Sequence, residues 1–207
     1  AADMYMARQL MRAAGCSALL IAKIERTEAV ANLDEILDAS DGIMVARGDL
    51  AVEVGDAAVP ALQKKMIRAA RDRNKLTITA TQMMESMITS PVPTRAEVSD
   101  VANAVLDGTD AVMLSAETAA GKFPVEVVEA MSRVCLEAEK SYDTGLDREM
   151  LDRVFTRIDQ SIAMAAIWTA YHLKVKAIAS LTQTGSTALW MSRLIAGVPI
   201  YALTPEV

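Results

Sequence analysis

Two apolar stretches of the sequence each end in residues that can do chemistry. Lys23 and Glu25 close the first stretch, and Gly48 and Asp49 follow the second. Because side chains alternate across a strand, Lys23 and Glu25 are expected to point to the same side of a strand over 18–25. Lys and Glu are seldom buried without a partner, so this pair indicates either an ion pair or a ligand site.

The two carboxylates, Glu25 and Asp49, lie one strand–helix unit apart in the sequence. Two carboxylates from neighbouring strands, completed by water and substrate oxygens, suit Mg²⁺, which prefers oxygen ligands and retains several waters. The alternative is structural: Glu25 pairs with Lys23 or Arg26, and Asp49 caps a turn. The residues alone leave both interpretations open.

Lys23 could bind a phosphate or a transition state, form a Schiff base, or serve as an ion-pair partner. Beside a metal ion, electrostatic stabilisation of a transferring anion is the most economical role. A Schiff-base lysine needs a lowered pKa, which a nearby carboxylate opposes. Gly48 allows a ligand to approach the backbone, where its N–H and that of Asp49 could hold a carboxylate; an ordinary tight turn is the alternative.

Strands that alternate with helices must position these residues. A first helix is expected over 4–14. Apolar stretches then predict four strands, each followed by a helix: strands at 18–25, 43–46, 76–81 and 111–114, and helices at 27–39, at 59–73, from the capping box Thr94–Glu97 onward, and at 124–140. This alternation predicts an α/β fold with parallel strands.

Each predicted strand ends in polar residues, as expected of a site at the carboxyl ends of parallel strands. These residues are Lys23 and Glu25, Arg47 to Asp49, Thr81 and Gln82, and Ser115 and Glu117. No loop of the pattern Gly-x-Gly-x-x-Gly follows any strand, which favours half of a TIM-type (β/α)8 barrel over an open nucleotide-binding sheet.

The composition becomes polar and turn-prone after Ser141, which predicts a boundary between a domain at 1–141 and a second at 142–207. The second domain is expected to begin another α/β unit, with a helix, a strand, a helix and a strand at 159–171, 176–181, 187–196 and 199–203. After its first strand come residues that suit an anion, although they also cap helices: Thr182, Thr184, Gly185, Ser186 and Thr187.

Composition excludes several classes of protein. The 207 residues carry a net charge of −6, and no basic stripe could neutralise nucleic-acid phosphates. The apolar runs are strand-sized and the start has no secretory pattern, so we expect no membrane segment and a cytoplasmic location. Cys16 and Cys135 are expected to be reduced thiols, and His172 to be structural. Both ends of the sequence look cut rather than finished.

Several motifs resemble those of the pyruvate kinase family. The segment ALLIAKIERTEAV at 18–30 is similar to the family's active-site signature at every position. The other motifs follow in collinear order: MVARGDL at 44–50, ATQMMESM at 80–87, PTRAE at 93–97, DVANAVLDG at 100–108 and MLSAET at 113–118. The resemblance implies a phosphotransferase of glycolysis that converts phosphoenolpyruvate and ADP to pyruvate and ATP.

The resemblance also implies a role for each polar strand end. Lys23 would stabilise the phosphoryl group in transfer, and Glu25 and Asp49 would bind the divalent metal, Mg²⁺ or Mn²⁺. The backbone of Gly48 and Asp49, with the hydroxyl of Thr81, would hold the substrate carboxylate. Three further residues would line the site, the last two as candidates for a proton relay to the enolate: Arg47, Ser115 and Glu117.

The resemblance covers only the last four strands of an eight-stranded barrel and the start of the C-terminal domain. The chain alone is therefore expected to be inactive, and the family's K⁺ ligands and most ADP contacts would lie in the missing amino-terminal part. The family also implies a homotetramer, with a subunit contact at Thr94, Arg95 and Glu97. It implies as well that a phosphorylated effector binds the loop at 182–187.

Two positions depart from the family pattern. Ala51 and Ala116 stand where members often have glycine, which predicts a variant branch with an intact site. Two other functions are to be weighed. A metal-dependent pyruvate or oxaloacetate aldolase would use a similar barrel, but it would lack Lys23 and the segment at 94–97. A non-catalytic module would supply subunit contacts or bind a phosphorylated metabolite at 182–187.

Overall fold

The computed structural model describes residues 1–141, 154–155, 157–194 and 197–205. Contacts between residues divide the chain into two compact units, Ala1–Ser141 and Tyr142–Val207, which are described in turn. No helix among the described residues is long and apolar enough to cross a membrane.

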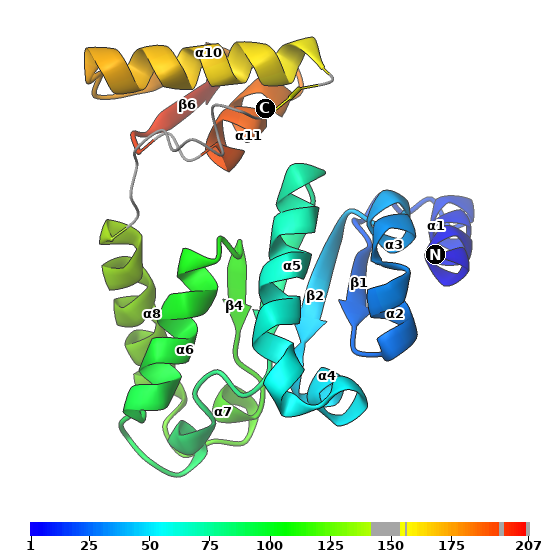
Figure 1. Ribbon diagram of the computed structural model, residues 1–207, viewed down its shortest axis with the longest axis vertical. Helices are drawn as coiled ribbons and strands as arrows, with labels where there is room; N and C mark the ends of the chain where they lie inside the picture. Colours follow the sequence, from blue (N-terminus) through cyan, green and yellow to red (C-terminus); the bar gives the residue numbers. More distant parts are fainter. Residues whose placement is uncertain (142–153, 156, 195–196, 206–207) are drawn as a thin grey trace. The chain divides into compact units, whose positions relative to one another are not determined.

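The first unit is built from strands that alternate with helices (Figure 1). Its strands are β1 (Ile21–Ile24), β2 (Gly42–Ala46), β3 (Leu76–Ala80) and β4 (Ala111–Met113). Its α-helices are α1 (Ala2–Ala13), α2 (Thr27–Ala31), α3 (Leu33–Ala39), α4 (Arg47–Val54), α5 (Val59–Asp72), α6 (Arg95–Leu106), α7 (Ala116–Ala119) and α8 (Pro124–Lys140). Two short 3-10 helices complete it, η1 (Asp56–Ala58) and η2 (Glu85–Ile88).

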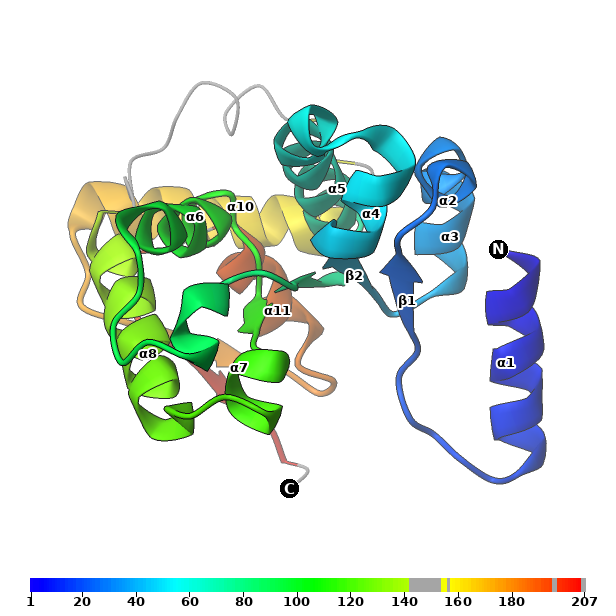
Figure 2. The ribbon, with the colours of Figure 1, turned by 90° about the horizontal axis from the view of Figure 1, so that it is seen from below.

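The four strands form one parallel sheet in the order β1-β2-β3-β4. Each strand therefore pairs with the next strand along the chain, whereas an open doubly wound sheet reverses its order at a switch point. Helices α3, α5, α6 and α8 lie along one side of the strands, as Figure 2 shows. The predicted α/β class with parallel strands is confirmed, and the strand order is that of consecutive units of a barrel.

The two faces of this sheet differ in burial. Ala22 and Ile24 of β1 pack with the helices and are at most 5% exposed. The opposite face carries Lys23, Met44 and Ile78, which lie next to one another in the strand register, and none of these three is buried. Lys23 therefore points to the face that the described helices leave uncovered.

Two local features differ from the expected helices. The helix expected over 27–39 is interrupted at Asn32, whose side-chain amide donates a hydrogen bond to the Glu28 carbonyl at 2.8 Å. The same carbonyl also accepts the Asn32 backbone N–H at 3.1 Å, and α3 begins at the next residue. After β2 the chain enters α4 at once, so the Gly48 backbone lies in the first turn of a helix and not in an isolated tight turn.

The expected capping box at the start of α6 is confirmed. Thr94 Oγ1 accepts a hydrogen bond from the Glu97 N–H at 3.3 Å, and the Glu97 carboxylate accepts one from the Thr94 N–H at 2.8 Å. Glu97 also accepts hydrogen bonds from the N–H (2.7 Å) and the hydroxyl (2.6 Å) of Ser86. Partial burial raises the pKa of Glu97, but the donors of Ser86 and Thr94 outweigh it and leave that pKa below its ordinary value.

Methionines fill the core beneath the loop that joins β3 to α6. Met83, Met84 and Met87 are fully buried and pack with Val101 of α6 and Val127 of α8. Flexible thioether side chains fill irregular space well. This core therefore fixes the loop after β3 against the two helices.

The second unit contains α10 (Ile158–Leu173), β5 (Ile178–Leu181), α11 (Ser186–Arg193) and β6 (Ile200–Leu203). Strands β5 and β6 are parallel, and the small core includes Ile167 of α10 and Met191 of α11. His172 packs on Trp168 with 4.4 Å between ring centroids, which agrees with a structural role. The expected end of α11 at 196 lies outside the described residues.

Candidate active site

Lys23 lies between two carboxylates at the carboxyl end of the sheet. Its Nζ forms an ion pair with Glu25, which follows β1, and lies 2.9 Å from Oδ2 of Asp49 in the first turn of α4. Lys23 and Glu25 thus share one side of the strand. The three side chains are 50%, 36% and 59% exposed in chain order, so the group is open to solvent and to a ligand.

Charge pairing sets the ionisation of this group. Hydrogen bonds to Glu25 and then to Asp49 raise the pKa of Lys23 above its ordinary value. The Lys23 ammonium in turn lowers the pKa of Asp49. Lys23 is therefore protonated at neutral pH, which suits the stabilisation of an anion and opposes a Schiff-base role, because that role needs a neutral amine.

The two carboxylates fit a divalent cation by their chemistry. Glu25 Oε2 is shielded from solvent and accepts no hydrogen bond of normal geometry, although it contacts Lys23 in the ion pair. Carboxylate oxygens are the donors that Mg²⁺ prefers, and water or substrate oxygens complete its shell. In the part of the chain that the structure describes, no group of three or more His, Cys, Asp or Glu side chains is arranged to hold a metal ion. Glu25 and Asp49 thus offer carboxylate oxygens of the kind that such an ion binds, with the rest of its shell left to water or substrate.

The Gly48 backbone and the Thr81 side chain are brought together beside this group. The Gly48 N–H donates to Thr81 Oγ1 at 2.9 Å, and the Thr81 hydroxyl donates to the Ala80 carbonyl at 2.6 Å. A Cβ added at Gly48 would lie 3.6 Å from Thr81 Oγ1, which is an ordinary contact. Packing within the chain therefore does not demand glycine at this position, whereas a ligand on the amide would.

Arg47 is buried and bonded to the loop after β3. It is 8% exposed, and its guanidinium donates to the Asp100 carboxylate on α6 at 2.7 Å and to the Thr81 carbonyl at 2.8 Å. These bonds do not bring Arg47 into the charged group around Lys23. Sequence reasoning gave Asp100 no role, because 53 residues separate it from Arg47 and no local pattern signals the pair.

Glu117 joins the loops that follow β3 and β4. It is 3% exposed, and its carboxylate accepts hydrogen bonds from the N–H of Ser115 at 2.8 Å and from the N–H of Met84 at 3.2 Å. Ser115 itself is exposed. The structure thus brings Glu117 to the Ser115 backbone, and a proton relay through the Ser115 hydroxyl stays a prediction.

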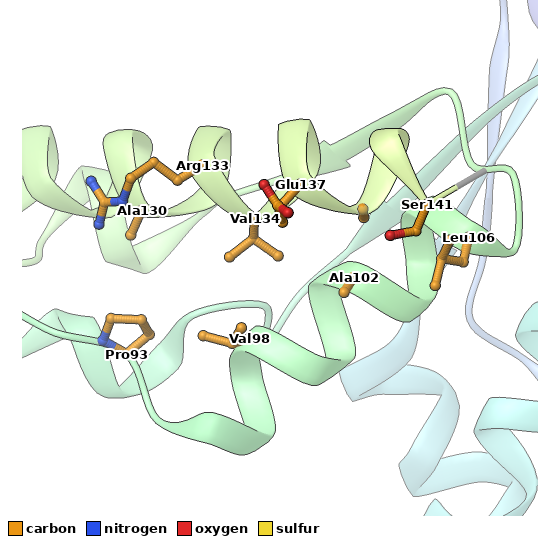
Figure 3. A pocket seen from close by; sticks show the side chains of 10 residues that line it. Pro93, Val98, Ala102, Leu106, Ala130, Arg133, Val134, Glu137 and Ser141 are labelled. Carbon is orange, nitrogen blue, oxygen red and sulfur yellow. The ribbon is translucent and has the colours of Figure 1, made fainter. Parts of the chain in front are cut away.

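A groove of about 570 Å³ lies apart from these residues, between α6 and α8 (Figure 3). Val98 and Ala102 of α6 face Val134 of α8 across it, with Arg133 and Glu137 among its polar lining residues. None of the predicted site residues lines this groove. The groove is therefore distinct from the site at the strand ends.

In the second unit, the loop between β5 and α11 is closed by its own hydrogen bonds. The Gly185 N–H donates to Thr182 Oγ1 at 3.0 Å, and the hydroxyls of Thr184 and Ser186 lie 3.2 Å apart. Gly185 has a φ of 80°, a conformation that favours glycine. No side chain caps the start of α11, so the capping explanation for these hydroxyls is not supported.

Comparisons with known proteins agree along the whole chain. The family model described as "Pyruvate kinase, barrel domain" matches residues 1–128, and that described as "Pyruvate kinase, alpha/beta domain" matches residues 160–207. The predicted fold, part of a barrel followed by part of an α/β domain, is confirmed by these matches.

Individual relatives carry the same name. A pyruvate kinase of Haemophilus influenzae is 57% identical over 207 residues, and pyruvate kinase II of Salmonella typhimurium is 57% identical over 206. Each alignment covers 98% of this chain and 43% of the relative, so the chain spans less than half the length of these proteins. The solved structure of a pyruvate kinase from Cryptosporidium parvum matches 99% of this chain and 44% of its own, with a TM-score of 0.91 and 43% identity.

Proposed function

The chain belongs to the pyruvate kinase family, and from this premise we propose that it supplies half of the active site of an enzyme that transfers a phosphoryl group from phosphoenolpyruvate to ADP. The observation that carries the proposal is the position of Lys23. Its ammonium lies between the carboxylates of Glu25 and Asp49, which come from two neighbouring strand ends, and it is open to solvent. Phosphoryl transfer needs mainly positioning and charge neutralisation, and this group can supply both.

In the proposed reaction, the bond between phosphorus and the enol oxygen of phosphoenolpyruvate breaks and a bond from phosphorus to a terminal oxygen of ADP forms. The remaining enolate takes a proton at its methylene carbon to give pyruvate. The protonated Lys23 stabilises the negative charge on the phosphoryl oxygens in transfer. The N–H groups of Gly48 and Asp49 and the hydroxyl of Thr81 orient the substrate carboxylate. This requires two present hydrogen bonds to open, the one from the Gly48 N–H to Thr81 Oγ1 and the one from the Thr81 hydroxyl to the Ala80 carbonyl.

Glu25 and Asp49 would hold a divalent metal, Mg²⁺ or Mn²⁺, which when bound supplies positive charge for the phosphoryl and enolate oxygens. The two carboxylates now share Lys23, so they are already oriented toward one point in space. We assign Ser115 and Glu117 to proton delivery at the enolate. The buried carboxylate of Glu117 would fix the Ser115 backbone so that the hydroxyl faces the substrate.

We also propose that a phosphorylated metabolite binds the loop at 182–187 as an effector. Support comes from the hydroxyls of Thr182, Thr184, Ser186 and Thr187 and from Gly185 at the amino end of α11, which suit an anion. A homotetramer, K⁺ dependence through ligands outside this chain and a cytoplasmic location are likewise proposals that follow from the family.

Activity is tested in a chimaera, defined as the Haemophilus influenzae relative with its matching segment exchanged for this chain. A coupled assay should show pyruvate formation that requires phosphoenolpyruvate, ADP and Mg²⁺ together. The 207-residue chain alone should show none, because the chain covers 43% of that relative. Pyruvate formation from oxaloacetate without nucleotide would instead favour the aldolase alternative, and no turnover in the chimaera would refute the phosphotransferase.

A further inference from the structure

Two residues at the end of β3 hold an unusual backbone conformation. Thr81 has a φ of 67° and Gln82 a φ of 54°, and neither is glycine. The left-handed region is disfavoured for side chains with a Cβ, and most of all for β-branched ones such as Thr. Such a conformation persists only where the surrounding structure imposes it. The contacts that impose it are therefore of functional interest, since the Thr81 hydroxyl faces the Gly48 amide.

Arg47 supplies the contacts. One guanidinium nitrogen, Nη2, donates to the carbonyl of Thr81 at 2.8 Å and to the carbonyl of Gln82 at 3.2 Å. It thus bonds the two peptide groups whose residues are in the left-handed region. A planar guanidinium can reach both carbonyls at once while its other nitrogen, Nη1, bonds elsewhere.

The other nitrogen bonds α6. Nη1 of Arg47 lies 2.7 Å from Oδ1 and 2.6 Å from Oδ2 of Asp100. Arg47 is 8% exposed, and burial of a cation is tolerated only where charge and hydrogen bonds compensate it. Asp100 is that compensating charge, so it fixes where the guanidinium lies and, through it, the carbonyls of Thr81 and Gln82.

Helix α6 holds the same loop at a second point. Glu97 lies one turn before Asp100, and its carboxylate accepts two hydrogen bonds from Ser86. The segment 81–86 is thus attached to α6 at both ends. Asp100 holds its start through Arg47, and Glu97 holds its end directly. Residues three apart lie on the same side of a helix. A movement of α6 would therefore be transmitted to the backbone of Thr81.

We propose that Asp100 and Arg47 are positioning residues: α6 holds Thr81 in its left-handed conformation through them, and the affinity for the substrate carboxylate depends on this hold. We assign neither residue a contact with the reacting atoms. The substrate half of this inference, the effect on affinity for the substrate carboxylate, rests on the proposed function. The structural half, the hold on the Thr81 backbone, does not. Asp100 thereby makes α6 a part of the site's support, although it lies 53 residues from Arg47 in sequence.

The structural half is tested by amide hydrogen exchange on the full chain without any ligand. Asp100→Ala should raise exchange at Gly48 and at 83–86 by about tenfold or more, since the hold on the loop is lost. Asn103→Ala is the matched control: it removes a side chain of the same size from the exposed side of α6 and should leave that exchange unchanged. Equal exchange in the two variants would overturn the proposal.

The substrate half is tested in the chimaera. Asp100→Ala should raise the KM for phosphoenolpyruvate about tenfold or more while kcat changes less than about threefold, because a positioning loss acts mainly on binding. Asp100→Asn, which keeps an oxygen acceptor, should recover part of the KM, and Arg47→Lys should behave like Asp100→Ala. An unchanged KM with raised exchange would overturn the link to the substrate.

Two outcomes separate this inference from the proposed function. If the unsubstituted chimaera transfers no phosphoryl group, the proposed function fails while the exchange experiment still decides whether Asp100 holds the loop. If Asp100→Ala does not fold, Asp100→Asn and Arg47→Lys carry the same two measurements. Raised loop exchange in both of these variants supports the proposal, and control-level exchange in both contradicts it.

Discussion

Lys23 on β1 and Asp49 in the first turn of α4 meet across two neighbouring strands, with 2.9 Å between Nζ and Oδ2. The same ammonium contacts Glu25, so one cation serves both carboxylates. Removing the cation therefore removes the charge that would face a phosphoryl group but leaves both oxygen ligands for a metal. This separation makes the two proposed roles testable one at a time.

Lys23→Met in the chimaera should lower kcat by about a thousandfold, the scale of losing a principal electrostatic stabiliser of a transition state. Binding of Mn²⁺, followed by electron paramagnetic resonance, should persist, since Glu25 and Asp49 remain. Lys65→Met removes an exposed lysine of α5 and is the control, with activity unchanged. Turnover of Lys23→Met within tenfold of the parent would refute the assigned role.

The pH response of Asp49 should reveal the same pair. Lys23 lowers the pKa of Asp49 in the folded chain. The stability that the ion pair contributes is therefore complete above the pKa of Asp49 in the unfolded chain, about 3.9. It is lost as the pH falls through the pKa of Asp49 in the folded chain. Lys23→Met should move the Asp49 titration midpoint upward. The measurement is a carbon NMR titration of the carboxyl group, and Lys65→Met should leave the midpoint in place; an unmoved midpoint in Lys23→Met contradicts the pairing.

Gly48→Ala and Gly42→Ala should have opposite consequences. A Cβ at Gly48 finds ordinary contacts, so stability should change by less than about 0.5 kcal/mol, while the KM for phosphoenolpyruvate rises about tenfold because the methyl group occupies the ligand's approach. A Cβ at Gly42 would lie 2.6 Å from the Leu76 carbonyl oxygen, and the strain should cost about 1–3 kcal/mol. Urea unfolding and kinetics measure the two effects; an unchanged KM in Gly48→Ala would argue against carboxylate binding there.

Glu97→Gln should destabilise the first unit by about 1–2 kcal/mol. Both oxygens of the Glu97 carboxylate accept hydrogen bonds from Ser86 and Thr94, whereas the amide of glutamine has one acceptor oxygen. The loss should be present at neutral pH and shrink as pH falls through the lowered folded pKa of Glu97, where the wild-type carboxylate is itself protonated. Glu126→Gln, at the matching position of the first turn of α8, is the control for urea unfolding. Equal losses in both variants would contradict the explanation.

The sequence predicted those parts of the site that depend on local periodicity. The shared side of Lys23 and Glu25 follows from strand alternation, and the Thr94–Glu97 capping box from spacing within one helical turn. The break of the helix at Asn32 was not predicted, because no Gly or Pro marks it in the sequence of residues 27–39. The left-handed conformation of Thr81 was not predicted either, since Arg47 and the distant Asp100 impose it through tertiary contacts.

Strands β1 and β4 are the outer strands of the four-stranded sheet, and each is paired along one side only within the described residues. The unpaired N–H and C=O groups on such a strand can form β-sheet hydrogen bonds with an extended segment of another chain. When the chain is synthesised by itself, the outer strands of another copy of the chain can supply such a segment. Self-association, visible as a rise in particle size with concentration, would then compete with folding and limit how the isolated chain can be purified.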